Sequence, residues 1–159
     1  MTVTKRHGFL GVFGVLAFVM VASPSFAAPK NTFGARLGVY TDIEELFLGV
    51  EGLAPLTSTQ LYFNPNVEFI LIDNGTFVTF NFDFHYDLPT QNRGLFFWTG
   101  GGLGLLYFNP EGPFGNDTDL GLNLLFGIGF NQANLVPYIQ SKFIISDNTE
   151  LSIGFGVRF

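Results

Sequence analysis

The 159-residue sequence contains no cysteine and few charged residues. Without cysteine the chain cannot form disulfides, thiolate metal sites or a lipid anchor on an N-terminal cysteine. Residues 28–159 keep five basic and 13 acidic side chains, a net charge near −8, so nucleic acid is not an expected partner. Only about one residue in seven of this segment is charged, against about one in four in soluble domains. An exterior exposed to water would therefore be short of charge.

The first 27 residues have the three parts of a secretory signal peptide. Two basic residues precede an apolar core at 9–22, and Ser25 and Ala27 fit the small residues of a cleavage site. An uncleaved anchor helix is the alternative, but the core holds about fifteen apolar residues where a membrane span needs about twenty. We expect cleavage after Ala27 and a single domain over 28–159, which is too short for two separate cores.

The rest of the chain alternates between apolar and small or polar residues, and no stretch shows a convincing helical period. Turn residues separate the alternating segments, with Asn74-Gly75 and Asp147-Asn148 predicting tight hairpins and 109–118 the one long connection. Eight strands are predicted, at 33–42, 44–56, 60–73, 75–88, 94–108, 118–131, 135–147 and 149–159. Eight is the smallest standard number of strands in a bacterial membrane barrel.

The last segment, ELSIGFGVRF at 150–159, alternates without a break and stops at a phenylalanine. Successive side chains of a strand point to opposite faces, so one face is apolar and the other small or polar. The apolar face consists of Leu151, Ile153, Phe155, Val157 and Phe159. A dyad pattern of this kind is typical of a strand with lipid on one side and a lumen on the other.

This closing strand resembles that of small bacterial outer-membrane β-barrel proteins, the porin-like superfamily with OmpA-, OmpX- and OmpW-like members. The resemblance implies an all-β fold, an eight-stranded antiparallel transmembrane β-barrel with up-and-down meander order. It also implies that Phe155, Val157 and Phe159 form the signal read by the barrel-assembly machinery. The expected location is the outer membrane of a Gram-negative bacterium, reached through the cleaved signal peptide, with outer-membrane lipids as partners.

Alternation alone does not say which face lies inside. A soluble lipocalin-like barrel would turn its apolar face inward around a ligand, leaving glycines such as Gly127 and Gly154 on a solvent face with very few charges. In a membrane barrel the same small residues would line a narrow lumen, where large side chains do not fit. The pattern favours the membrane barrel.

The segment 94–108 fits the alternation less well. Its glycines leave room inside, but Phe96 and Trp98 then also point inward. Two explanations stay open: a bulge near Gly100-Gly101 that corrects the register, or an aromatic girdle at the membrane interface.

Charges within the strand interiors fall on the face opposite the apolar one. The predicted lumen network is Arg36, Glu51, Glu68, Asp83, His85, Lys142 and Arg158. Buried charges are tolerated when they are paired, so one reading is a network that plugs the lumen. The other is a narrow path for water or ions.

Catalysis is a third class to consider. Asp83, His85 and Asp87 share one strand face, but neighbouring same-face positions lie nearly 7 Å apart, which is poor geometry for a shared metal. Lipid A deacylases, which resemble this fold, carry a His-x-Ser-Asn signature near the C-terminus that this sequence lacks. We expect no enzymatic activity, no metal and no cofactor.

The sequence therefore predicts an integral outer-membrane barrel with a structural or surface-interaction role in the cell envelope. A narrow porin-like channel for small solutes or ions is the alternative, and a soluble periplasmic carrier of apolar ligands a further one. Fold does not choose among these roles, and no surface partner follows from the residues.

Overall fold

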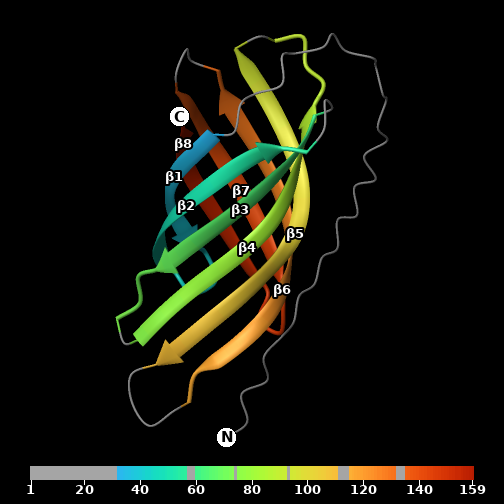
Figure 1. Ribbon diagram of the computed structural model, residues 1–159. Helices are drawn as coiled ribbons and strands as arrows, with labels where there is room; N and C mark the ends of the chain where they lie inside the picture. Colours follow the sequence, from blue (N-terminus) through green and yellow to red (C-terminus); the bar gives the residue numbers. More distant parts are fainter. Residues whose placement is uncertain (1–31, 57–59, 74, 93, 111–114, 132–134) are drawn as a thin grey trace, which may run out of the picture.

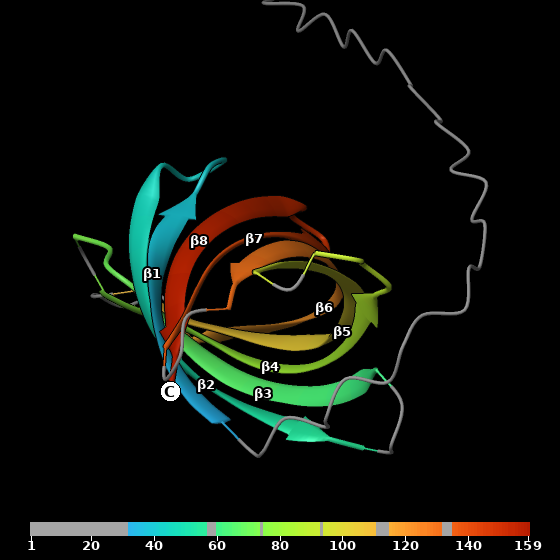
Figure 2. The ribbon, with the colours of Figure 1, turned by 90° about the horizontal axis from the view of Figure 1, so that it is seen from above.

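The computed structural model is a closed antiparallel β-barrel of eight strands (Figures 1 and 2). It describes residues 32–56, 60–73, 75–92, 94–110, 115–131 and 135–159. The predicted signal peptide, with Ser25 and Ala27, lies outside the described residues. The strands are β1 (Thr32–Tyr40), β2 (Glu45–Pro55), β3 (Leu61–Ile70), β4 (Gly75–Leu88), β5 (Leu95–Pro110), β6 (Asp117–Phe130), β7 (Val136–Ile145) and β8 (Glu150–Arg158).

Each strand pairs with the next in the chain, and β1 pairs with β8 to close the sheet. This closing seam runs from Gly34 opposite Arg158 to Tyr40 opposite Ser152. Reciprocal backbone hydrogen bonds between Phe33 and Phe159, 2.9 and 3.3 Å long, extend the seam to the last residue. The predicted eight-stranded antiparallel meander is confirmed, and no described helix is long and apolar enough to cross a membrane.

The barrel has two distinct ends. We call the end where β1 begins and β8 finishes the terminal end, and the opposite end, where β1–β2, β3–β4, β5–β6 and β7–β8 connect, the hairpin end. The wall is uneven in height, because β5 has 16 residues while β1 and β8 have nine each. Figure 1 shows β5 and β6 reaching farthest toward the hairpin end.

The bulge near Gly100-Gly101, one of the two explanations left open for the fifth strand, is wrong. β5 pairs with β4 and with β6 in unbroken register, including Gly100 opposite His85 and Gly101 opposite Phe84. Phe96 and Trp98 therefore keep the inward phase, and Trp98 is fully buried inside the barrel and is not part of an interfacial girdle. The strand also extends past the predicted end, to Pro110, which shortens the connection expected at 109–118.

Glycines on neighbouring strands make room for the inward aromatic rings. A Cβ atom added to Gly127 would lie 2.1 Å from the Trp98 ring, and one added to Gly156 would lie 2.2 Å from the Tyr138 ring. Phe96 occupies the same kind of space above Gly129. The glycine-rich inner face predicted from the alternation is thus what allows a narrow barrel to hold large side chains.

The outside of the barrel is apolar. Large hydrophobic side chains on the outward phase of every strand are exposed. Representatives around the wall are Leu37, Leu48, Phe69, Phe82, Leu103, Leu122, Phe143 and Phe155. The terminal-strand residues Phe155, Val157 and Phe159 belong to this outer face. Exposing an apolar surface of this extent to water is unfavourable, so the outer face needs an apolar surrounding.

The glycine of one predicted hairpin has a positive φ. Gly75 has a φ of 127°, a conformation that glycine adopts without steric cost. Asn74, its partner in the predicted turn, lies outside the described residues. β4 begins directly at Gly75 and ends at Leu88, the bounds predicted from the sequence.

Candidate functional site

All seven residues predicted for the lumen have their side chains buried inside the barrel. None is more than 5% exposed. They come from six strands: Arg36 from β1, Glu51 from β2, Glu68 from β3, Asp83 and His85 from β4, Lys142 from β7 and Arg158 from β8. Three cations thus share the lumen with three carboxylates, so the set is balanced in charge.

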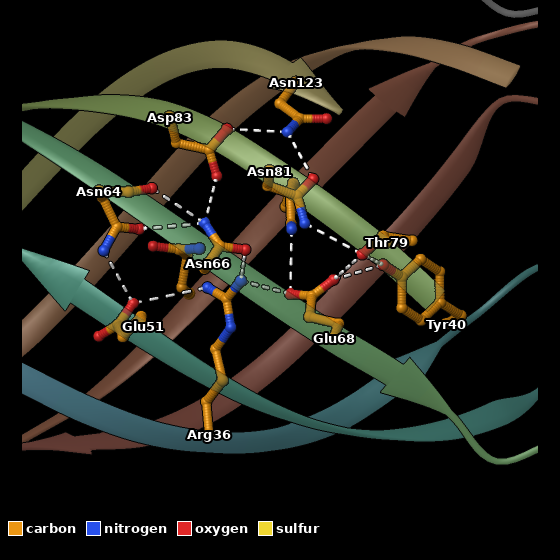
Figure 3. Close-up of polar contacts among 12 residues, drawn as sticks. Arg36, Tyr40, Glu51, Asn64, Asn66, Glu68, Thr79, Asn81, Asp83 and Asn123 are labelled. Atoms are coloured by element: carbon orange, nitrogen blue, oxygen red, sulfur yellow. Dashed lines mark hydrogen bonds and ion pairs between the residues drawn. The ribbon is translucent and has the colours of Figure 1, made fainter. Parts of the chain in front are cut away.

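Glu68 is a hub of this network (Figure 3). Its Oε1 lies 2.6 Å from Nη2 of Arg36 and 3.0 Å from Nζ of Lys142. Its Oε2 accepts hydrogen bonds from the hydroxyl of Tyr40 and, at 3.2 Å, from that of Thr79. Both carboxylate oxygens therefore have two partners, which offsets much of the cost of removing the charge from water.

Glu51 forms the second charged cluster, nearer the terminal end. Its Oε1 accepts a 2.6 Å hydrogen bond from Nε of Arg158. Its Oε2 accepts one of 3.1 Å from Nδ2 of Asn64 and lies 3.6 Å from Nη1 of Arg36. Because Arg36 also pairs with Glu68, its guanidinium joins the two carboxylates and links β1 to β2 and β3.

Asp83 is held by side-chain amides. Nδ2 of Asn66 donates to its Oδ2 at 2.9 Å, and Nδ2 of Asn123 donates to its Oδ1 at 2.8 Å. Asn123 also donates to Asn81, which in turn donates to the hydroxyl of Thr79. This series of hydrogen bonds connects Asp83 to the group around Glu68, as Figure 3 shows.

An aromatic layer covers the network on its terminal side. The Trp98 indole donates through Nε1 to Oε1 of Gln140 at 3.1 Å. The Arg158 guanidinium lies over the rings of Trp98 and Tyr138, 4.9 and 4.4 Å from their centroids. The His85 ring stacks on Trp98 at 5.8 Å. We call Trp98, Tyr138, His85 and Arg158 the terminal layer.

His85 packs against Trp98 in the terminal layer, and its Nε2 atom has no hydrogen-bond partner among the described residues. The carboxylate of Asp83 is bonded to amides, and the imidazole lies against the Trp98 ring. Across the described ranges, no three His, Asp or Glu side chains are grouped so as to hold a metal ion.

An apolar layer closes the other side of the network. It consists of Tyr40, Phe47, Ile70, Leu106 and Ile144, all buried, with Ile72 and Phe77 packed against them. The Tyr40 ring meets Phe47 edge to face at 5.4 Å, while its hydroxyl donates to Glu68. We call these residues the hairpin layer. The lumen thus has three levels: apolar at the hairpin end, charged in the middle, aromatic at the terminal end.

The predicted network omitted several residues that complete it. They are Tyr40, Asn64, Asn66, Thr79, Asn81, Asn123 and Gln140, and all are buried. Each lies on the inward phase of its strand, so the alternation of the sequence already indicates that these side chains face the lumen. Extending the prediction from charged residues to every polar residue on the inward face would have found most of them.

Known proteins resemble this chain in fold. No family model matches it, and no curated protein does. The N-terminal β-barrel domain of OprF from Pseudomonas aeruginosa is similar with a TM-score of 0.68 and 17% identity, over 82% of this chain and 97% of that one. Neisserial surface protein A follows with 0.57 and 13%, over 80% and 93%.

The outer-membrane enzyme PagL is a third similar structure, with a TM-score of 0.55 and 14% identity, over 80% of this chain and 98% of that one. At such identities the likeness shows the fold alone. That fold, found here with an apolar outside and a charged inside, is the one of small outer-membrane β-barrels.

Proposed function

We propose that the protein is an integral outer-membrane β-barrel with a structural or surface-interaction role in the cell envelope and without enzymatic activity. The carrying observation is the distribution of side chains: the belt around the wall is apolar and exposed, while the charged residues of the lumen network are inside and bonded to opposite charges or to amides. A soluble barrel with an apolar ligand cavity would have the reverse arrangement. A barrel with an apolar exterior and a charged interior is stable in lipid.

The layers of the lumen support a plugged barrel over a channel. Passage of small solutes needs a continuous path of water. The hairpin layer is apolar, and the terminal layer holds a fully buried indole across the same lumen. Between them, Glu51 and Glu68 are paired with basic side chains, and Asp83 accepts hydrogen bonds from amides.

The similarity to PagL makes enzymatic activity a question for this chain too. Acyl transfer and hydrolysis by a serine require a base within hydrogen-bond reach of the hydroxyl. Among the described residues, no serine hydroxyl is hydrogen-bonded to His85, whose ring is packed on Trp98. This geometry supports a role other than catalysis.

Short connections limit the surface that the protein offers to a partner. At the hairpin end, β1 and β2 are separated by four residues, and β7 and β8 also by four. Recognition by the barrel-assembly machinery, with Phe155, Val157 and Phe159 as its signal, is part of the proposal, and the exposure of these side chains on the outer face is compatible with it.

The proposal is tested by comparing the gel mobility of the outer-membrane fraction before and after boiling. Closed barrels resist unfolding in cold detergent, so we expect the protein in that fraction with a mobility that shifts on heating. Recovery in the soluble periplasm without a shift would contradict the proposal and favour the carrier of apolar ligands.

A further inference from the structure

A small cavity remains inside the charged level of the lumen, next to the closing seam. Its volume is about 10 Å³. Polar side chains from four strands line it: Arg36, Glu68, Tyr138, Gln140, Lys142 and Ser152. A space of about 10–15 Å³ on this measure is the minimum that holds one water molecule.

Two of the lining side chains carry buried polar atoms that have no hydrogen-bond partner. These atoms are Nε of Arg36 and the hydroxyl oxygen of Tyr138. The side chains are buried, with 5% and 2% of their surface exposed. The Tyr138 hydroxyl lies near the Glu51 carboxylate but outside hydrogen-bonding geometry. Buried polar groups in folded proteins are almost always satisfied, by protein or by ordered water.

The lining favours an occupant that accepts hydrogen bonds. Arg36 and Lys142 are donors only, and both oxygens of Glu68 already accept two contacts each. Tyr138 and Ser152 carry hydroxyls that can donate or accept. Water serves both kinds of partner and adds no charge to a network that is already balanced.

We propose that one ordered water molecule is bound in this cavity, accepting a hydrogen bond from Nε of Arg36 and bonding the hydroxyl of Tyr138. Arg36 belongs to β1 and Tyr138 to β7, strands that both pair with β8 and not with each other. The water therefore connects the two strands on either side of β8. Its role is to stabilise the closing seam from inside the lumen.

The direct test is a high-resolution crystal structure of the detergent-folded protein, grown with sodium bromide. We expect one water peak within hydrogen-bond distance of both atoms and no anomalous bromide signal there. An empty cavity would overturn the proposal, and a bromide peak would overturn it in favour of an anion site. The outcome does not depend on where the protein resides in the cell.

A variant gives a second, independent test. Tyr138→Phe removes the hydroxyl and keeps the ring that packs over Gly156 and under Arg158. If water bonds the hydroxyl, its loss should lower the folding equilibrium constant about five-fold. Tyr86→Phe, on the outer face, is the matched control and should change it little. If the cavity is dry, Tyr138→Phe removes an unsatisfied group and leaves stability equal or higher, which would overturn the proposal.

Discussion

The middle of the lumen and its hairpin end are enclosed by the same eight strands but have opposite chemistry. The middle holds the cations Arg36 and Lys142 and three carboxylates, bonded to one another, to Arg158 of the terminal layer and to amides. The hairpin layer is a packed apolar cluster. Tyr40 belongs to both, since its ring packs on Phe47 and its hydroxyl donates to Glu68.

The two levels stabilise the barrel in different ways. A charged network depends on specific partners, because removing one member leaves another charge buried without compensation. An apolar layer depends on volume, because removing atoms leaves a cavity. The charged level should therefore be the more sensitive to single substitutions, and the apolar layer should be what excludes water.

Glu68→Ala should have the largest effect. It leaves Arg36 and Lys142 buried without their shared carboxylate, at a cost of about 4 kcal/mol in the free energy of unfolding. Urea unfolding of the refolded protein in lipid vesicles measures this cost. Asp73→Ala removes an exposed carboxylate and is the control. A loss as small as that of the control would contradict the hub role of Glu68.

Ile144→Ala tests the packing of the hairpin layer. Ile144 is fully buried in it, so its truncation should lower the free energy of unfolding by about 3 kcal/mol through the cavity it creates. The neighbouring Ile145 points outward and is 45% exposed. Ile145→Ala, measured in the same vesicles, should cost clearly less. Equal losses at the two positions would argue that the hairpin layer is not packed as described.

Gly127→Ala tests the space beside Trp98 in the terminal layer. A methyl group there meets the Trp98 ring at 2.1 Å, and such overpacking should cost about 2 kcal/mol. In β2, a Cβ atom on Gly52 would have only Pro65 nearby, at 3.8 Å, so Gly52→Ala is a matched control in a strand. If both variants are as stable as the parent protein, Trp98 does not lie over Gly127.

Arg158→Lys should have the smallest effect. Lysine keeps the charge beside Glu51 but loses the flat contact with Trp98 and Tyr138, worth about 1 kcal/mol. Trp98 is the only tryptophan of the chain, so its emission reports on this layer directly. The emission should change in the variant while acrylamide quenching stays weak. Strong quenching in the parent protein would place Trp98 outside the lumen.

Much of the fold was predictable because alternation reports which face each residue occupies. β4 has its predicted bounds, and the other strands differ from prediction by a few residues at their ends. The same alternation placed the seven titratable residues on one face, and the structure places them inside. The alternation also held through β5, where the bulge suggested to keep the large rings of Phe96 and Trp98 out of the lumen is absent.

The contacts across the lumen were not predictable from one strand at a time. Trp98 fits because its neighbour in β6 is Gly127, and Glu68 meets Lys142 from a strand 74 residues away in the chain. Which side chains meet depends on the stagger of the strands around the closed sheet. That stagger is a property of the whole barrel, so no single segment contains it.

A plugged lumen carries no current, and conductance across a planar bilayer measures this. Protein that shows the heat-dependent gel shift should give no unitary current steps, even at high dose and high salt. Sustained steps whose size changes in Lys142→Gln would contradict a plugged lumen and establish a path through the charged level.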